Sequence, residues 1–420
     1  MKCGLSGLAL LTALAGGGAA APPTFHKDIE PLLQRHCQGC HRPGEAAPMA
    51  LLHYHQVRPW AKAIREAVLS RRMPPWHATA PAGHFSNDRS LAAAEIVLIR
   101  DWVDAGSPEG DPRDAPQSLI FRDGWNIGAP DHVFEMPLDF EVPPKGDLEY
   151  VHFAVSTGFK EDRWIERWEV RPGNRAAVHH IGIYLRPPGS KWLPAVLPAG
   201  GGVPLRDRTV ARTPSDEHFA MFLPGAGWEI LPAGQARLIP AGSDLIFQVH
   251  YQTIGKTVRD RSRFGVAFSK SPPKQRIHTI AVGNATFVIP PGDPNYFVRG
   301  SFTVFHPVTV LAITPHMHLR GKAFECGVIP QGGEFQSLLR VPRYDRNWQV
   351  LYKLSNPVPV ERLSRLHCMA WFDNSANNPW NPDPGAEVRW GDQTRDEMMV
   401  GYFEVALPAE VSHTKALYLR

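Results

Sequence analysis

The sequence has few cysteines and little net charge. Five of its 420 residues are cysteines, too few for a fold that is held together mainly by disulfide bonds. Its 45 basic and 41 acidic side chains leave a formal net charge of +4, and no basic cluster stands out. A protein that binds nucleic acid through its charge carries a clearer excess of lysine and arginine. We therefore expect neither a disulfide scaffold nor a nucleic-acid partner.

Long apolar segments and nucleotide-binding motifs are also missing. No segment beyond the N-terminus approaches the roughly 20 consecutive apolar residues that a membrane-spanning helix needs. We find no Ser-His-Asp arrangement and no glycine-rich phosphate-binding loop in a strand–helix context. The chain does contain 43% hydrophobic residues, enough for folded cores. Its 36 glycines and 41 prolines favour turn-rich β structure over a mostly helical fold.

Residues 1–21 have the three parts of a secretory signal peptide. Lys2 supplies a positive charge, a short apolar stretch follows, and small residues end at Ala21. We predict cleavage after Ala21 and a periplasmic or secreted mature protein without a membrane span; an uncleaved N-terminal anchor is the alternative. In an oxidising compartment Cys326 and Cys368 can form one disulfide, although the sequence does not show that they lie close together.

A motif for covalent haem attachment follows. Cys37, Cys40 and His41 form Cys-x-x-Cys-His, in which two thiols attach a c-type haem and the imidazole binds its iron. A zinc knuckle would need a second cysteine pair, and a redox Cys-x-x-Cys would need a βαβ pattern that is absent. For the sixth iron ligand we favour Met73, which prolines follow. The alternatives are Met49, His53, His55 and His77.

The residues around this motif predict helices. Residues 25–36 fit a short amphipathic helix, and residues 91–105 fit a second helix with Ser90 as its N-cap and Gly106 as its stop. Ile96, Ile99, Trp102 and Val103 would form the apolar face of the second helix. Together with the haem motif, this arrangement resembles a small class I cytochrome c, an all-α domain, over residues 25–110.

The composition changes after a proline-rich linker at residues 108–116. Short alternating runs that are broken by proline and glycine then recur, which favours β-sandwiches. The region from residue 117 to residue 415 is longer than one sandwich usually needs. We therefore expect a multidomain chain with two all-β domains, over residues 117–276 and 277–415.

Three groups of histidines lie in the predicted strands. His316 and His318 can share one strand face, because residues i and i+2 point the same way, so the two can bind one metal ion. The neighbours His179 and His180 face opposite sides, and would need a β-bulge or different ring nitrogens to share an ion. His250 lies near the end of another strand. Taken singly, each group is weak evidence of a metal site.

Four segments in order resemble the ligand motifs of the copper type II, ascorbate-dependent monooxygenases. This is the family of peptidylglycine alpha-hydroxylating monooxygenase and dopamine beta-monooxygenase. The matching segments are 178–184 (VHHIGIY), 248–251 (QVHY), 316–322 (HMHLRGK) and 396–398 (DEM). The resemblance implies two jelly-roll-like β-sandwiches with one copper ion in each. It assigns an electron-transferring site of His179, His180 and His250, and a catalytic, oxygen-activating site of His316, His318 and Met398.

Two imidazoles and a thioether suit both copper oxidation states, and Met399 is the open alternative to Met398.

The implied reaction inserts one oxygen atom of O2 into a C–H bond of a small organic substrate and releases the other as water. It consumes two electrons, which the family takes from ascorbate. Here we hypothesise that a periplasmic donor, an ascorbate-like reductant or a redox protein, reduces the haem, which passes electrons to the copper at His179, His180 and His250.

The match also has departures. In the peptide-amidating member, an arginine, an asparagine and a tyrosine hold the peptide carboxylate, and Thr314, Val400 and Tyr402 occupy those positions here. Loss of the arginine removes a bidentate carboxylate contact, so a glycine-extended peptide is not the expected substrate. Two other functions stay open: a non-catalytic haem/copper electron-transfer or copper-binding protein, and a hydrolase or lyase with a three-histidine zinc site.

Overall fold

The computed structural model describes residues 21–411, apart from 46, 82, 122–123, 147, 191, 193–202, 205–216, 224 and 392. The predicted signal peptide lies outside the described residues except for Ala21. Within the described part, no helix is long and apolar enough to cross a membrane.

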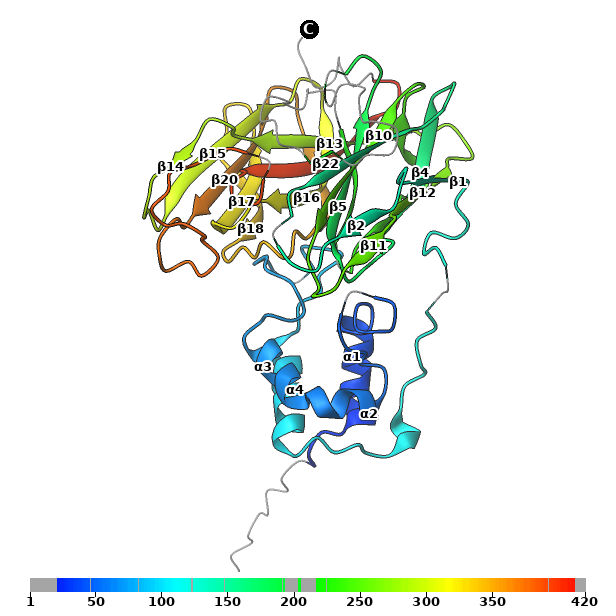
Figure 1. The fold of residues 1–420 in the computed structure, drawn as a ribbon, viewed down its shortest axis with the longest axis vertical. Coiled ribbons are helices and arrows are strands. Elements are labelled where there is room, and N and C mark those ends of the chain that lie inside the picture. Colours follow the sequence, from blue (N-terminus) through cyan, green and yellow to red (C-terminus); the bar gives the residue numbers. More distant parts are fainter. Residues whose placement is uncertain are drawn as a thin grey trace, which may run out of the picture.

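Short helices form a separate group at the N-terminal end of the described chain (Figure 1). Their apolar side chains build a core of their own, which includes Phe25, Leu33, Val57, Ile99 and Trp102. These short helices do not by themselves establish a cytochrome fold. In order they are η1 (Phe25–Ile29), α1 (Glu30–His36), α2 (Tyr54–Val57), η2 (Arg58–Trp60), α3 (Ala61–Leu69), α4 (Ala93–Asp104) and η3 (Pro112–Asp114).

The start of α4 differs from the prediction, whereas its end agrees. Ser90 is not the N-cap, and the helix begins at Ala93. The carboxylate of Glu95 instead accepts the N–H of Ala92 at 2.9 Å, which satisfies a backbone donor at the helix start. Gly106 follows the helix with φ +88°, a conformation that favours glycine.

The rest of the described chain is mostly β structure, as predicted, and forms two sandwiches with separate cores. The first contains β1 (His132–Glu135), β2 (Phe140–Val142), β3 (Val151–Ser156), β4 (Arg163–Arg171), β5 (Val178–Arg186), β6 (Val203–Pro204), β7 (Glu217–Phe222), β8 (Trp228–Ile230), β9 (Gln235–Ile239), β10 (Asp244–Tyr251), β11 (Val258–Asp260) and β12 (Arg263–Phe268). The second contains β13 (Gln275–Gly283), β14 (Val288–Ile289), β15 (Tyr296–Thr303), β16 (Val308–His316), β17 (Gly321–Ile329), β18 (Gln336–Val341), β19 (Tyr352–Val360), β20 (Arg365–Phe372), β21 (Val388–Arg389) and β22 (Val400–Pro408).

One sheet runs through both sandwiches, which the sequence did not lead us to expect. Strands β9 and β13 pair in parallel, through Gln275 with Gln235 and Arg276 with Ala236. The resulting nine-stranded sheet has the order β1-β12-β4-β9-β13-β22-β16-β19, with β8 beside β4. The sheet β6-β3-β10-β5-β7 completes the first sandwich, and the sheet β15-β20-β17-β18 completes the second. The two halves are therefore held edge to edge.

A segment between α3 and α4 leaves the helices and packs on the second sandwich (Figure 1). The N–H of Thr79 donates to the carbonyl of Arg340 at 2.9 Å, and Phe85 forms a β-bridge with Leu354. Trp76 joins the apolar core of the second sandwich. Residues near the end of α3 are consequently carried to the surface of the second sandwich.

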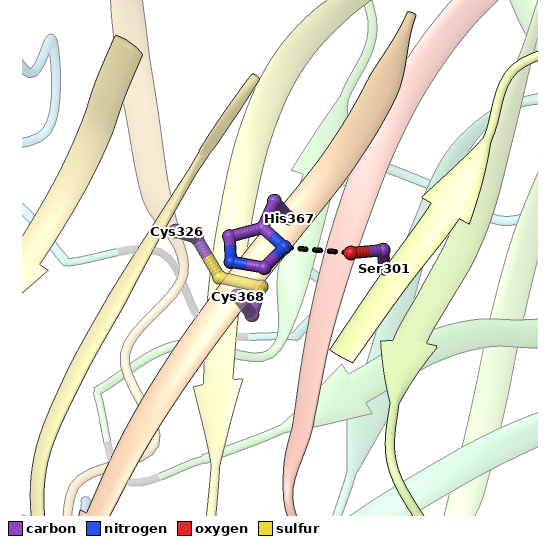
Figure 2. The surroundings of a disulfide bond; sticks show 4 residues. All are labelled: Ser301, Cys326, His367 and Cys368. Carbon is purple, nitrogen blue, oxygen red and sulfur yellow. Dashed lines mark hydrogen bonds between the residues drawn. A yellow bond between two sulfur atoms is a disulfide. The ribbon is translucent and has the colours of Figure 1, made fainter. Parts of the chain in front are cut away.

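Cys326 and Cys368, whose pairing the sequence left open, form a disulfide (Figure 2). The two cysteines are direct partners in the β17–β20 ladder, and both are buried. Figure 2 also shows Ser301 and His367 beside the bridge, with 2.6 Å between the hydroxyl oxygen and Nδ1. Gly401 of β22 packs on the bridge so closely that a Cβ there would lie 2.7 Å from the Cys326 Sγ. The disulfide thus lies directly behind the strand that follows Met398.

Candidate metal centres

Three histidines of the first sandwich converge on one point. His179 and His180 lie on β5 and His250 lies on the neighbouring β10, and their nearest ring nitrogens are all within 4.8 Å of one another. The Nδ1 atoms of His179 and His180 are 3.0 Å apart. The Nδ1 of His250 is buried without a hydrogen-bond partner. This histidine triad has the spacing and the unsatisfied nitrogen of a metal-ion site.

A β-bulge allows the two adjacent histidines to meet. In the β5–β10 ladder His250 pairs with His180, and the next residue, Tyr251, pairs with Val178. His179 is therefore an extra residue without a partner on β10, which turns its side chain toward that of His180. The bulge is one of the two arrangements that the sequence left open.

The triad imidazoles are neutral near pH 7. Burial lowers the pKa of His179 to about 4 and that of His250 to about 3, and the charge of Arg346 lowers both further. Burial, followed by the other histidines, also lowers the pKa of His180 well below its ordinary value. Neutral imidazole is the form that binds a metal ion, so the three rings are ready to do so without losing protons.

His316 and His318 form a second pair. His316 is the last residue of β16, and the centroids of the two rings are 5.1 Å apart. The Nδ1 of His316 lies 2.7 Å from the side-chain oxygen of Gln349, and the Nδ1 of His318 lies 3.1 Å from the carbonyl of Asp396. The Nε2 of His318 is buried without a partner. Contacts at Nδ1 that leave Nε2 for the ion are typical of metal-binding histidines.

The methionine that the motif indicates lies beside this pair. Met398 lies two residues before the start of β22 and lines the same cavity as His316 and His318. The neighbouring Met399 instead packs in the apolar core of the second sandwich. Of the two methionines left open by the sequence, Met398 is the one placed next to the histidines.

Glu397 connects the methionine segment to the histidine segment. Its fully buried carboxylate accepts the N–H of His318 at 2.9 Å and the N–H of Arg320 at 2.6 Å. Burial raises the pKa of Glu397 to about 7, although these backbone donors act in the opposite direction. The contact fixes Met398 relative to His318, and only the position of Glu397 within the motif could have indicated it.

The two histidine groups share a single small cavity of about 20 Å³. His180 of the triad lines it together with His316, His318 and Met398. Tyr150 lies between the groups, with its ring centroid 4.8 Å from that of His250 and 6.5 Å from that of His318. None of the lining side chains is an aspartate, glutamate, lysine or arginine. The two predicted sites are thus neighbours across one uncharged space, which has room for about one water molecule.

The predicted haem motif directly follows α1. Cys37 and Cys40 are free thiols, and burial raises the pKa of Cys37 to about 12. The Nδ1 of His41 lies 3.3 Å from the carbonyl of Met49, which orients the ring as expected of an iron ligand. Unpaired thiols and an imidazole held at Nδ1 fit the chemistry of covalent haem attachment.

The candidates for the sixth iron ligand lie in different surroundings. Met73 is half-buried after α3, with its N–H 3.2 Å from the carbonyl of Ala67. Met49 packs against the apolar core of the helices. The rings of His53 and His55 stack on each other, and His77 lines a cavity on the second sandwich. Met73 remains our prediction for this ligand.

Comparison with known proteins does not place the chain in a family. No family model and no curated protein matches it. The major capsid protein P2 from bacteriophage PM2 has a TM-score of 0.28 at 8% identity, over 67% of this chain and 99% of that protein. A structure of Broad Bean Stain Virus has a TM-score of 0.29 at 7% identity, over 72% of this chain and 95% of that one. Scores this low carry no conclusion about function.

Proposed function

We propose that the chain is an exported copper-dependent monooxygenase that hydroxylates a C–H bond of a small organic substrate with O2 and takes its electrons through a fused c-type haem. The observation that carries the proposal is that His316, His318 and Met398 line one cavity with His180 of the triad. The ordered resemblance of these segments to the copper monooxygenase motifs supports it. In this proposal the two sandwiches are the jelly-roll-like domains of that family, and the helices are a cytochrome c domain.

The donor atoms suit copper at both sites. His179, His180 and His250 would hold one ion, and His316, His318 and Met398 would hold the other. Three imidazoles, or two imidazoles and a thioether, accept both Cu(I) and Cu(II), whereas zinc more often takes a carboxylate or thiolate as well. When bound, the two ions would supply one electron each and the activation of O2, with one oxygen atom inserted into the substrate and the other released as water.

The haem would be held by Cys37, Cys40 and His41, with Met73 as the predicted sixth ligand, and it would supply one-electron storage next to the copper domains. Cys40 packs against Gly225 of the first sandwich, and the nearby Arg175 pairs with Glu45 at 2.6 Å. Arg175 lies four residues before His179 in the chain. The ion pair brings the residues that follow the Cys-x-x-Cys-His motif against the loop that leads into β5.

Other residues of the chain position the ligands and limit the substrate. Gln349 contacts the ring of His316, and Glu397 accepts the backbone N–H of His318. Tyr150 lies between this histidine pair and the triad. Thr314 and Val400 replace the residues that hold a peptide carboxylate in the peptide-amidating member, so we do not propose a glycine-extended peptide as the substrate.

One observation favours a second candidate function. The shared cavity of about 20 Å³ leaves no space for an organic molecule between the two histidine groups as they stand. A non-catalytic haem/copper protein that transfers electrons or carries copper would need no such space. Substrate-dependent consumption of O2 separates the two functions.

The test starts from the holoprotein, reduced anaerobically with dithionite and then mixed with ¹⁸O2 and a panel of small organic compounds. The proposal predicts haem reoxidation that depends on one class of compound and ¹⁸O in the product. Met398→Ala should abolish incorporation, whereas Met369→Ala, which changes a half-buried methionine of β20, should leave it intact. Reduced haem that no compound and O2 together reoxidise would rule out the monooxygenase.

A further inference from the structure

A larger cavity, of about 230 Å³, lies where the segment after α3 meets the second sandwich. Arg71 and Arg72 line it from the helical side, and Arg343 and Arg346 line it from the loop between β18 and β19. Asp345 is the one acidic side chain in its lining. Four guanidinium groups around one carboxylate make this cavity, which we call the arginine pocket, strongly positive.

Three of these four cations form no ion pair with another described residue. Within the described residues Arg72 pairs with Glu66, and no ion pair involves Arg71, Arg343 or Arg346. The Nε of Arg346 is buried without a hydrogen-bond partner, and so is the Nε2 of His77 in the same lining. An unsatisfied buried donor costs about 1–3 kcal/mol, so the Nε–H of Arg346 indicates a ligand that accepts hydrogen bonds.

The pocket also has an aromatic wall. The guanidinium of Arg346 lies 4.9 Å over the ring of Trp380, and Tyr344 contributes a second aromatic side chain. Stacking on a ring fixes the plane of a guanidinium and leaves its N–H edge to bind an oxyanion. A ligand with an apolar body as well as a charge would fit this combination better than an inorganic ion.

The pocket adjoins both histidine groups. His318 lines it as well as the small shared cavity. The charge of Arg346 lowers the pKa of His179 and of His250, so this arginine also lies near the triad. A molecule in the arginine pocket would therefore sit next to the proposed copper ligands, where the shared cavity itself has no room for it.

We propose that the arginine pocket binds an organic carboxylate, with Arg343 and Arg346 as the main contacts. A volume near 230 Å³ is below the usual range of about 300–1,000 Å³ for drug-sized ligands, so a free acid in it is small. The inference rests on the proposed function in making a free acid the substrate or reductant, and in supplying the haem as the second source; the binding of a free acid needs no metal. The carboxylate can belong to a free acid or to the propionates of the covalently attached haem.

The experiment titrates the holoprotein with benzoate and, separately, with inorganic phosphate, and follows tryptophan fluorescence and heat of binding. We expect saturable binding of benzoate, tighter than that of phosphate. Arg346→Gln should weaken it by about tenfold or more, since it removes charge-assisted hydrogen bonds. Arg346→Lys should recover part of the affinity, and Arg259→Gln, at an exposed arginine of β11, should change nothing.

The outcomes separate the two sources of the carboxylate. Saturable benzoate binding that needs Arg346 supports a free acid. No benzoate binding, together with a shift of the haem optical spectrum and reduction potential in Arg346→Gln, supports the haem propionates. If neither occurs, or if phosphate binds as tightly as benzoate, the inference is wrong. Binding that persists in protein that never takes up copper would leave this inference standing while the proposed function fails.

Discussion

At the scale of single residues, the second histidine pair depends on side chains that bind no ion themselves. Gln349 contacts the Nδ1 of His316, and the carbonyl of Asp396 contacts the Nδ1 of His318. Glu397, next to Met398 in the chain, accepts the backbone N–H of His318. Such outer contacts fix the ring orientation and the basicity of the ligand nitrogen. The site therefore has a support that can be tested without changing any ligand.

Replacement of Gln349 by leucine tests this support. The variant leaves the Nδ1 of His316 without its 2.7 Å contact, so we expect copper affinity at the second site to fall by about 10- to 100-fold. Competition with a chelator of known affinity measures the change. Gln336→Leu, at an exposed position of β18, is the control, and an equal loss there would show that the effect is not local.

The sequence singled out the candidate ligands but not the side chains that support them. The order of the four motifs brought His179, His180 and His250 together as one set, whereas the sequence left the pairing of Cys326 with Cys368 open. Gln349 and Tyr150 could not be anticipated, because their role comes from contacts with residues far away in the chain. Ser90 was mistaken for a cap because Glu95 competes for the same backbone donors.

At the scale of elements, β22 lies between the disulfide and the second histidine pair. Its Gly401 faces the bridge, and the preceding Val400 is paired with His316 in the β16–β22 ladder. Only glycine leaves room for the sulfur atoms of Cys326 and Cys368 at this point. The disulfide therefore sets the position of the strand that follows Met398.

Gly401→Ala should destabilise the fold by about 1–3 kcal/mol, because the new methyl group overlaps the disulfide sulfurs. Urea unfolding measures the cost. The same change in a Cys326→Ala/Cys368→Ala background should cost clearly less, since the sulfurs are gone. An unchanged cost in that background would show that Gly401 is required for another reason.

The presence of β structure after residue 116 was predicted, but the assembly of the strands was not. The predicted change to β structure after residue 116 agrees with the strands from β1 onward, and a bulge at His179 was one of the two arrangements that the two-residue repeat of a strand allowed. Strands β9 and β13 pair through only two residue pairs, whose members lie far apart in the chain. Such a short pairing leaves no periodic pattern in the sequence. For this reason two separate sandwiches were expected where one sheet crosses both.

At the scale of the whole molecule, a buried ion cluster holds the two sandwiches together. Arg237 of β9 is 1% exposed and donates to Glu217 of β7 at 2.9 Å, to Thr279 of β13 at 3.0 Å and to Glu404 of β22 at 2.6 Å. It joins strands of both halves at the place where the continuous sheet passes between them.

Arg237→Met should destabilise the protein by about 3–5 kcal/mol, because it leaves Glu217 buried without this partner. Arg163→Met removes the partner of Glu161 in an exposed ion pair, and should change stability by no more than about 0.5 kcal/mol. Equilibrium unfolding of the two variants compares them directly. Equal effects would contradict a special role of the buried cluster.

The same cluster predicts a dependence on pH. Burial alone would raise the pKa of Glu217, but His278, Arg237 and Arg276 outweigh it and hold the pKa well below the ordinary 4.5. A lowered folded-state pKa contributes stability above pH 4.5 that is lost as the pH falls through the folded value. Below pH 4.5, Glu217→Gln should therefore lose stability less steeply than the wild type. Parallel curves from acid unfolding would refute this.

The contact between the helices and the first sandwich depends on Gly225. A Cβ there would overlap the Cys40 sulfur, and its carbonyl accepts a hydrogen bond from Arg89 at 2.9 Å. Gly225→Ala should loosen this contact and speed hydrogen exchange in the segment that carries Cys40. Gly234→Ala has a similarly positive φ, 84° against 79°, but its Cβ would lie 3.9 Å from Lys274, so it controls for backbone strain. Equal exchange in both variants would argue against the contact.

The metal content of the purified full-length protein, with its optical and EPR spectra, tests the central claim most directly. The account predicts one c-type haem iron and two Cu(II) ions per chain, and one copper fewer in His250→Ala with the haem unchanged. Zinc in place of copper, or a copper content that His250→Ala does not alter, would contradict it.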